Sequence, residues 1–115
     1  MIITLKNNKN IKLEWNFLVL EYLEEYETPE GRGIVQLERD IKMKKNLLKI
    51  NNIFVYALVS ACSNELLTYR DTLRLVKVDD YSKIIEFIKK NTDNYENFKK
   101  KGKKYTQAQR KKKCK

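Results

Sequence analysis

Few side chains of this 115-residue chain could perform chemistry, and none has the partner that catalysis requires. The sequence contains no histidine, which removes the commonest general base and the commonest metal ligand. Cys62 ends an apolar segment, where burial raises the pKa of a thiol, so we expect a structural core cysteine there. Cys114 lies among lysines, which lower a thiol pKa, and we interpret it as an incidental thiol. Two distant cysteines predict neither a disulfide framework nor a metal-ligand cluster.

Acidic residues gather at Glu21, Glu24 and Glu25 and again at Asp79 and Asp80. Paired carboxylates can perform acid–base catalysis or bind a metal. Here the glutamates occupy the polar side of an amphipathic segment, and the aspartates stand at an expected helix start, where the helix dipole favours anions. We therefore expect no catalytic residue, no metal site, no cofactor and no enzymatic activity.

A β-hairpin is predicted at residues 2–15. The segments Ile2–Leu5 and Ile11–Trp15 are rich in strand-forming residues, and the second alternates apolar and polar side chains. The asparagine-rich connector between them tolerates the positive φ angles of hairpin turns.

Helical periodicity starts after this hairpin, with Asn16 as the expected N-cap. The segment 28–33 holds the only proline and two of the three glycines, so we expect a loop there. Further helices are expected where apolar residues recur at helical spacing, with Asn51 and Asn52 breaking the chain between two of them. Thr68 and Asp71 resemble a capping box. The predicted helices cover residues 16–27, 34–48, 52–62, 69–76 and 80–91.

The fold class that follows is mainly α (α+β): a hairpin and a small bundle of four to five helices, forming one globular domain over residues 1–91. A flexible, partly disordered basic tail is expected over residues 92–115. No apolar segment reaches the length of a membrane span, and no secretory leader is recognisable, so a cytoplasmic location without membrane contact is expected.

The net charge of +10 is confined to the end of the chain. Residues 99–115 contain ten Lys or Arg and no Asp or Glu, which leaves 15 basic and 15 acidic residues elsewhere. Lysines interleaved with aromatic rings suit nucleic acid, because the charges neutralise phosphates and the rings stack on bases. The candidate residues of this tail are Lys99, Lys100, Lys101, Lys103, Lys104, Tyr105, Arg110, Lys111, Lys112 and Lys113. Basic ends also serve as solubilising or docking arms, so both interpretations stay open.

One family resemblance emerges from the order of these segments. The opening IITLKNNKNIKLEWNF runs directly into LVLEYLEEY, and a glycine-containing loop, the apolar segment Ile53–Cys62, an acidic leucine-rich helix and an isoleucine-rich helix follow. Over most of residues 1–91 this layout resembles the tail assembly chaperones of long-tailed bacteriophages and prophages of Gram-positive bacteria.

The resemblance implies a non-enzymatic protein that binds the tape measure protein, keeps it soluble and helps to recruit the tail tube protein during assembly. It also implies self-association. A helical client requires an apolar groove or patch. The residues that could supply one are Trp15, Leu18, Val19, Tyr22, Tyr26, Ile34 and Leu37. The same residues could instead be ordinary core, and the competing function is nucleic-acid binding through the lysine-rich tail.

Overall fold

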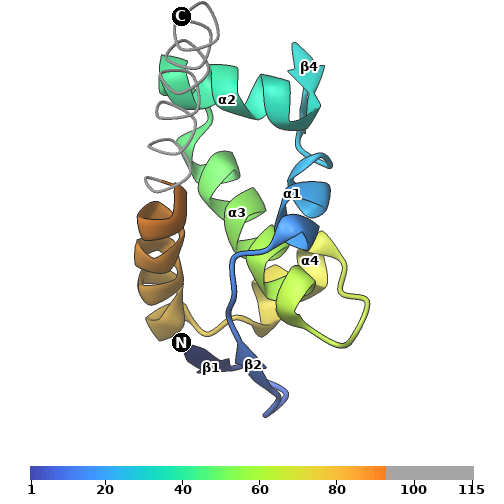
Figure 1. Cartoon of the computed structure of the whole chain (residues 1–115), viewed down its shortest axis with the longest axis vertical. Coiled ribbons are helices and arrows are strands. Elements are labelled where there is room, and N and C mark those ends of the chain that lie inside the picture. Colours follow the sequence, from blue (N-terminus) through green and yellow to red (C-terminus); the bar gives the residue numbers. More distant parts are fainter. Residues whose placement is uncertain (93–115) are drawn as a thin grey trace, which may run out of the picture.

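The computed structural model describes residues 1–92, and the basic tail beyond them lies outside the described residues. These residues form an N-terminal hairpin and five helices, which confirms the predicted fold class (Figure 1). A second, two-residue hairpin lies between the first two helices. The elements are β1 Ile2–Thr4, β2 Asn10–Lys12, α1 Phe17–Leu23, β3 Glu27–Thr28, β4 Gly31–Arg32, α2 Gly33–Met43, α3 Leu47–Cys62, α4 Tyr69–Leu75 and a fifth helix over residues 78–92.

The N-terminal hairpin follows the prediction. Strands β1 and β2 are antiparallel with Ile3 opposite Ile11, and both side chains are buried. Asn8 adopts a φ of 66° in the connecting turn, the left-handed conformation that asparagine tolerates. The Lys6 N–H donates to the Leu75 carbonyl at 2.8 Å, which attaches the hairpin to the end of α4.

Helix α1 begins where its cap predicts and ends earlier than expected. The Asn16 side chain accepts hydrogen bonds from the backbone N–H groups of Leu18 and Val19, as an N-cap does. The predicted end at residue 27 is wrong, because the chain turns after Leu23 and leads into β3. The Gly33 N–H donates to the Tyr26 carbonyl at 2.7 Å, so the second hairpin holds this turn closed.

The helix predicted over residues 34–48 is in fact broken. Lys44 and Asn46 both adopt left-handed conformations with φ of 54°, which ends α2 and starts α3. The Lys45 N–H caps the end of α2 by donating to the Asp40 carbonyl at 2.9 Å. The break expected at Asn51 and Asn52 is also wrong, because both residues lie inside α3.

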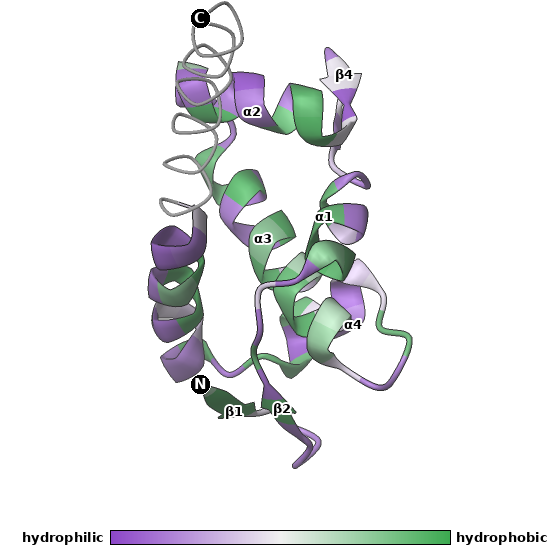
Figure 2. Ribbon diagram, in the orientation of Figure 1, coloured by the Kyte–Doolittle hydropathy of each residue, from purple (hydrophilic) through white to green (hydrophobic). Residues whose placement is uncertain are grey.

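Helix α3 is the centre of the core. Val55, Ala57, Leu58 and Val59 are fully buried, as the prediction of a helix packed on several sides requires. In Figure 1, α3 runs through the middle of the molecule, with α1 and the fifth helix on opposite sides and α2 crossing its start. Most of α3 is hydrophobic in Figure 2, whereas α2 mixes hydrophobic and hydrophilic residues.

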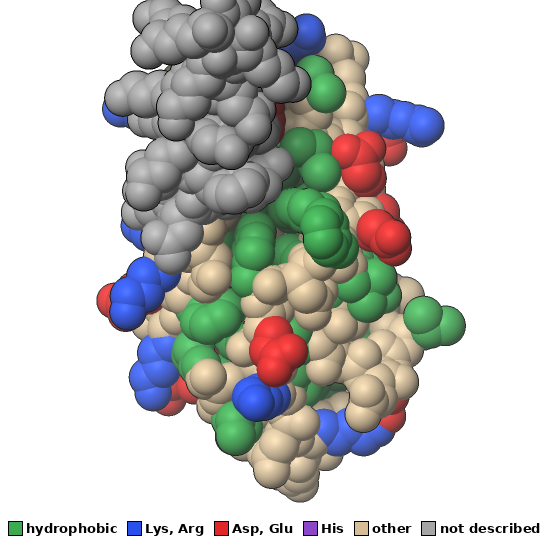
Figure 3. Space-filling model, in the orientation of Figure 1, with side chains coloured by type: hydrophobic (Ala, Val, Ile, Leu, Met, Phe, Trp, Pro, Cys, Tyr) green, Lys and Arg blue, Asp and Glu red, His purple; other side chains and the backbone are tan. Residues whose placement is uncertain are grey.

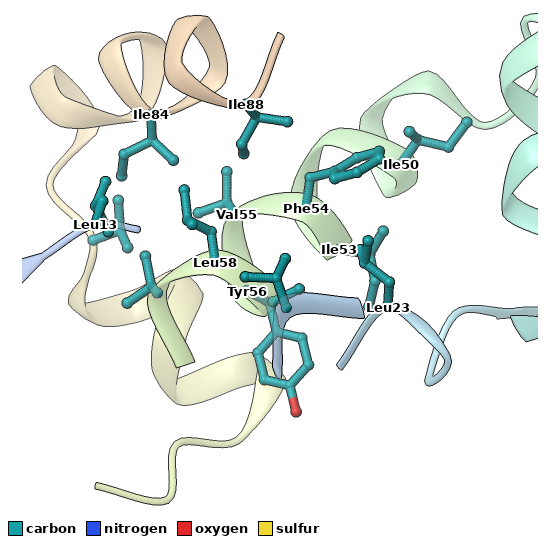
Figure 4. Packing of buried hydrophobic residues seen from close by; sticks show 14 of the residues in the cluster. Leu13, Leu23, Ile50, Ile53, Phe54, Val55, Tyr56, Leu58, Ile84 and Ile88 are labelled. Carbon is teal, nitrogen blue, oxygen red and sulfur yellow. The ribbon is translucent and has the colours of Figure 1, made fainter. Parts of the chain in front are cut away.

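The fifth helix covers α3 with its isoleucines. Ile84 and Ile88 point toward α3 in Figure 4 and are 0% and 4% exposed. This helix starts at residue 78, two residues before the predicted start, so Asp79 and Asp80 lie in its first turn. The Tyr81 hydroxyl donates to the Asn52 side chain at 2.6 Å, which gives that asparagine a role inside α3.

Helix α4 is short and begins at its predicted cap. The Thr68 side chain accepts a hydrogen bond from the Asp71 N–H at 3.1 Å. The helix ends at Leu75, one residue before the predicted end. Its buried Thr72 lies 3.1 Å from the Ser60 hydroxyl, so a polar contact joins α4 to α3 inside the core.

Candidate protein-binding surfaces

The predicted partner-binding residues are divided between core and surface. Val19, Tyr26 and Leu37 are at most 2% exposed and belong to the core. Trp15, Tyr22 and Ile34 are half-buried, and only Leu18, at 42%, is counted among the exposed large apolar residues. The stripe predicted on α1 therefore contributes mainly to packing in this structure. The predicted basic residues of the tail lie outside the described residues.

The two half-buried aromatic residues of this stripe stack on rings of α3. The Trp15 ring lies 6.4 Å from the Phe54 ring, measured between centroids. The Tyr22 ring meets the Tyr56 ring edge to face at 5.4 Å. Such pairs stabilise the contact between the elements that carry them.

A first exposed apolar group lies at the start of α1. Phe17 is 85% exposed and directly precedes Leu18. Phe17 is not among the predicted partner-binding residues, because it follows the N-cap and lies off the apolar stripe. We name Phe17 and Leu18 the α1 patch.

A second exposed apolar group lies where α2 meets α3. Met43, Leu47 and Leu48 are 65%, 56% and 71% exposed. The left-handed residues between them end one helix and start the next within a few positions, so both helix ends keep apolar side chains outside the core. We name these three residues the junction patch. None of these three residues is among the predicted partner-binding residues. The sequence signal for the patch is the segment KMKKNLLK, in which lysines flank the apolar residues.

A groove of about 540 Å³ lies beside the end of α1. Its walls come from the turn after α1, from α3 and from the start of α4. Tyrosine rings and carboxylates dominate it, and we name it the tyrosine groove. Its lining residues are Glu25, Tyr26, Glu27, Thr28, Pro29, Lys49, Ile53, Tyr56 and Tyr69.

Hydrogen bonds and ring contacts hold the walls of the tyrosine groove in place. The Tyr56 hydroxyl donates to the Glu25 carboxylate at 2.8 Å, and the Tyr56 and Tyr69 rings meet at 5.5 Å. Burial, followed by the neighbouring Glu25 carboxylate, raises the pKa of Tyr56 above its usual range. The Lys49 ammonium donates to the Glu27 carbonyl and lies 5.7 Å from the centre of the Tyr26 ring.

Two of the predicted solvated glutamates have structural partners. Glu25 bonds Tyr56, and Glu24 accepts a hydrogen bond from the Ile34 N–H at 3.1 Å. Arg32, the N-cap residue of α2, makes no side-chain capping bond, so Glu24 caps this helix from α1. Gly33 has a φ of 82° here, and a Cβ would lie 2.9 Å from the Glu24 carboxylate.

Asp40 is a buried carboxylate with a full set of donors. It is 2% exposed and accepts hydrogen bonds from the Tyr26 hydroxyl at 2.5 Å, the Gln36 amide at 2.9 Å and the Asn46 amide at 3.4 Å. These donors, the Tyr26 hydroxyl first among them, lower the pKa of Asp40. Its role is structural, because the bonds connect the turn after α1, helix α2 and the N-cap residue of α3.

Cys62 is partly buried, where the sequence analysis expected a core residue. Its thiol lies 3.2 Å from both the Glu14 backbone nitrogen and the Glu14 carbonyl oxygen, which attaches the segment after β2 to the end of α3. Burial raises the pKa of this thiol. Cys114 lies outside the described residues.

Within residues 1–92, no group of three His, Cys, Asp or Glu side chains is placed to hold a metal ion. None of the helices in this part of the chain is long and apolar enough to cross a membrane. Comparison with protein-family models, curated proteins and solved structures found no match. The candidate surfaces are therefore defined by the exposure and the contacts of their own residues.

Proposed function

We propose that this protein is a phage tail assembly chaperone. It binds the tape measure protein in the cytoplasm of a bacterial host, keeps it soluble and helps to recruit the tail tube protein. The proposal is supported by the resemblance of residues 1–91 to that family. It is also supported by a surface that offers apolar side chains to a protein partner.

The junction patch is the observation that carries this proposal. A helical client presents an apolar stripe, and Met43, Leu47 and Leu48 offer exposed aliphatic side chains to cover it. The unbranched methionine adapts to irregular partner surfaces. Burying each of these partly exposed side chains would contribute about 1–2 kcal/mol, since full burial of such a residue is worth about 1.5–3 kcal/mol.

The charges around the junction patch indicate which client helix fits best. Lys42 and Lys44 flank Met43 in the sequence and are exposed, whereas the ammonium groups of the nearby Lys45 and Lys49 contact Glu30 and the Glu27 carbonyl. A client helix whose apolar stripe is flanked by Asp or Glu would meet Lys42 and Lys44 at the rim. Such rim charges speed association and select the partner more than they add affinity.

The test is co-expression of the full chain with the tape measure protein encoded in the same gene cluster. We expect the client to become soluble and to co-purify with the wild-type chain. The variant M43S/L47S/L48S should lose at least nine tenths of the co-purified client while keeping its fold. The matched control is L66S/V78S, which removes two side chains that are 95% and 82% exposed elsewhere.

Two outcomes would contradict the proposal. A client that remains equally insoluble with and without this chain would exclude the chaperone function. Equal client recovery with the junction variant and its control would exclude the junction patch as the binding surface.

Nucleic-acid binding is the second candidate function, because ten basic residues are concentrated in residues 99–115. It predicts binding to duplex DNA or RNA that weakens steeply with salt and disappears on truncation after Phe98. Client binding through the junction patch should survive the same truncation. Electrophoretic mobility shifts at 50 and 200 mM salt distinguish the two functions.

A further inference from the structure

We infer that the tyrosine groove is a docking site for the chain's own basic segment, residues 99–115. The groove offers aromatic rings with carboxylates at its rim, and the segment supplies lysines around a tyrosine. This inference does not depend on the proposed chaperone function.

Opposite charges are concentrated at two separate places in the sequence. Residues 13–31 contain six glutamates and no Lys or Arg, whereas residues 99–115 contain ten Lys or Arg and no Asp or Glu. The groove lies in the acidic segment, because residues 25–29, which include Glu25 and Glu27, form one of its walls. Figure 3 shows carboxylate side chains at the edge of the molecule beside α1.

Most of these glutamates lack a basic partner within the described part of the chain. Glu14 pairs with Lys12 at 3.6 Å and Glu30 with Lys45 at 3.7 Å. The other four glutamates, which are exposed, make no ion pair with a Lys or Arg of residues 1–92. They are Glu21, Glu24, Glu25 and Glu27. A basic segment on this face would therefore meet carboxylates that no lysine or arginine of the described body neutralises.

The groove already holds one lysine ammonium, and its contacts show how others would be bound. The Lys49 ammonium uses a backbone carbonyl and the face of the Tyr26 ring. Tyr56 is only 4% exposed, so further aromatic surface comes from the half-buried Tyr69 ring, and Glu25 and Glu27 outnumber Lys49 among the charged lining residues. Lysines of the segment can bind the rim carboxylates while Tyr105 packs against the Tyr69 ring.

The chain beyond residue 92 is long enough to reach the groove. Residues 93–98 extend up to about 20 Å, and residues 99–115 add more than about 50 Å, at about 3.3 Å per residue. The longest principal extent of the molecule is 58 Å, which a chain of this extended length can span. A short tether also gives an effective concentration in the millimolar range, which favours docking within one molecule over docking between copies.

Carbodiimide cross-linking of the full chain tests the inference directly, because it joins lysines to carboxylates in contact. We expect Glu25 and Glu27, the two carboxylates that line the groove, to be cross-linked to lysines of residues 99–113, in preference to Asp79 and Glu86 on the fifth helix. A mixture of ¹⁴N- and ¹⁵N-labelled protein distinguishes the source, and single-isotope cross-links support docking within one molecule. Mixed-isotope cross-links at the statistical frequency would overturn it in favour of a second copy.

Trypsin cleavage within residues 99–115 provides a second readout on the full chain. Docking protects these lysines, so E25Q/E27Q should raise the tail cleavage rate about threefold to tenfold. Both carboxylates are exposed, an amide oxygen at position 25 can still accept from the Tyr56 hydroxyl, and Lys49 bonds only the Glu27 backbone carbonyl, so the fold should be kept. The matched control, D79N/E86Q, removes two exposed carboxylates away from the groove and should leave the rate unchanged. Equal rates in the two variants, or cross-links spread evenly over all exposed carboxylates, would overturn the inference.

Discussion

The Tyr26 hydroxyl donates a 2.5 Å hydrogen bond to the Asp40 carboxylate, and both residues are almost fully buried. Tyr26 follows α1 and Asp40 lies in α2, so this bond and the Glu24 cap on α2 both join the end of α1 to α2. Asp40 also accepts from Gln36 within α2 and from Asn46 at the start of α3. One carboxylate therefore fixes the relative position of three helices.

Removing the Tyr26 hydroxyl should destabilise the fold. A hydrogen bond to a charged group contributes about 1.5–3 kcal/mol, so Y26F should lower the free energy of unfolding by about that amount. For a domain of this size, each kcal/mol corresponds to about 4–8 °C in Tm. Thermal unfolding followed by circular dichroism measures the loss. The control is Y22F, which alters a half-buried tyrosine whose hydroxyl has no hydrogen-bond partner among the described residues. Equal Tm values for the two variants would contradict a special role for this bond.

Acid should weaken the fold through Asp40. Its donors lower its pKa in the folded state below the ordinary value of 3.8. A carboxylate with a lowered pKa contributes stability above its unfolded pKa, and that contribution is lost as the pH falls through the folded pKa. We expect the Tm to decrease as the pH falls from about 4 toward 2. The variant D40N should start from a lower Tm and show a smaller decrease, whereas D79N, altered at an exposed site, should keep the wild-type slope.

Alkali should weaken the fold through Tyr26. Burial, together with the bond to Asp40, raises the pKa of Tyr26 from 10.0 to about 12. Because the folded state favours the neutral hydroxyl, Tyr26 makes its full contribution to the folding stability below pH 10, and this contribution is lost as the pH rises toward 12. The absorbance of tyrosinate at about 295 nm should therefore show fewer groups titrating near pH 10 in the native chain than in urea. Identical titration curves in the two states would contradict the burial of Tyr26 and Tyr56.

The two thiols should differ in reactivity. Burial raises the pKa of Cys62, which lowers its thiolate fraction at pH 8, and its thiol is held by the Glu14 backbone. In the variant C114S, Cys62 should react with Ellman's reagent at least tenfold more slowly than the remaining thiol of C62S. Urea should remove most of this difference, because only the lysines next to Cys114 in the sequence then distinguish the two thiols. Fast native reaction of Cys62 would contradict its position in the structure.

Local features of the fold were predictable from the sequence. Asn16 and Thr68 cap helices where their side chains predict, and Asn8 takes the left-handed turn conformation expected of the asparagine-rich connector. The apolar segment after Asn52 forms the buried helix that its composition indicates. Caps, turns and apolar periodicity depend on residues within a few positions of one another, so the sequence displays them directly.

Helix boundaries that depend on tertiary contacts were not predictable in this way. Asn52 was expected to interrupt a helix, yet its side chain is bonded by Tyr81 from the fifth helix. Glu24 was expected to face solvent, yet it caps α2. These partners lie far enough along the chain that no local pattern reveals them.

The sequence by itself determined a small helical domain with an N-terminal hairpin, and it located the entire net charge of +10 in residues 99–115. Only the tertiary structure decided which apolar residues stay outside the core. Val19 and Leu18 are neighbours on one predicted stripe, yet the first is 0% and the second 42% exposed. Burial depends on which segments pack against a helix face, and that packing is settled by contacts between distant parts of the chain.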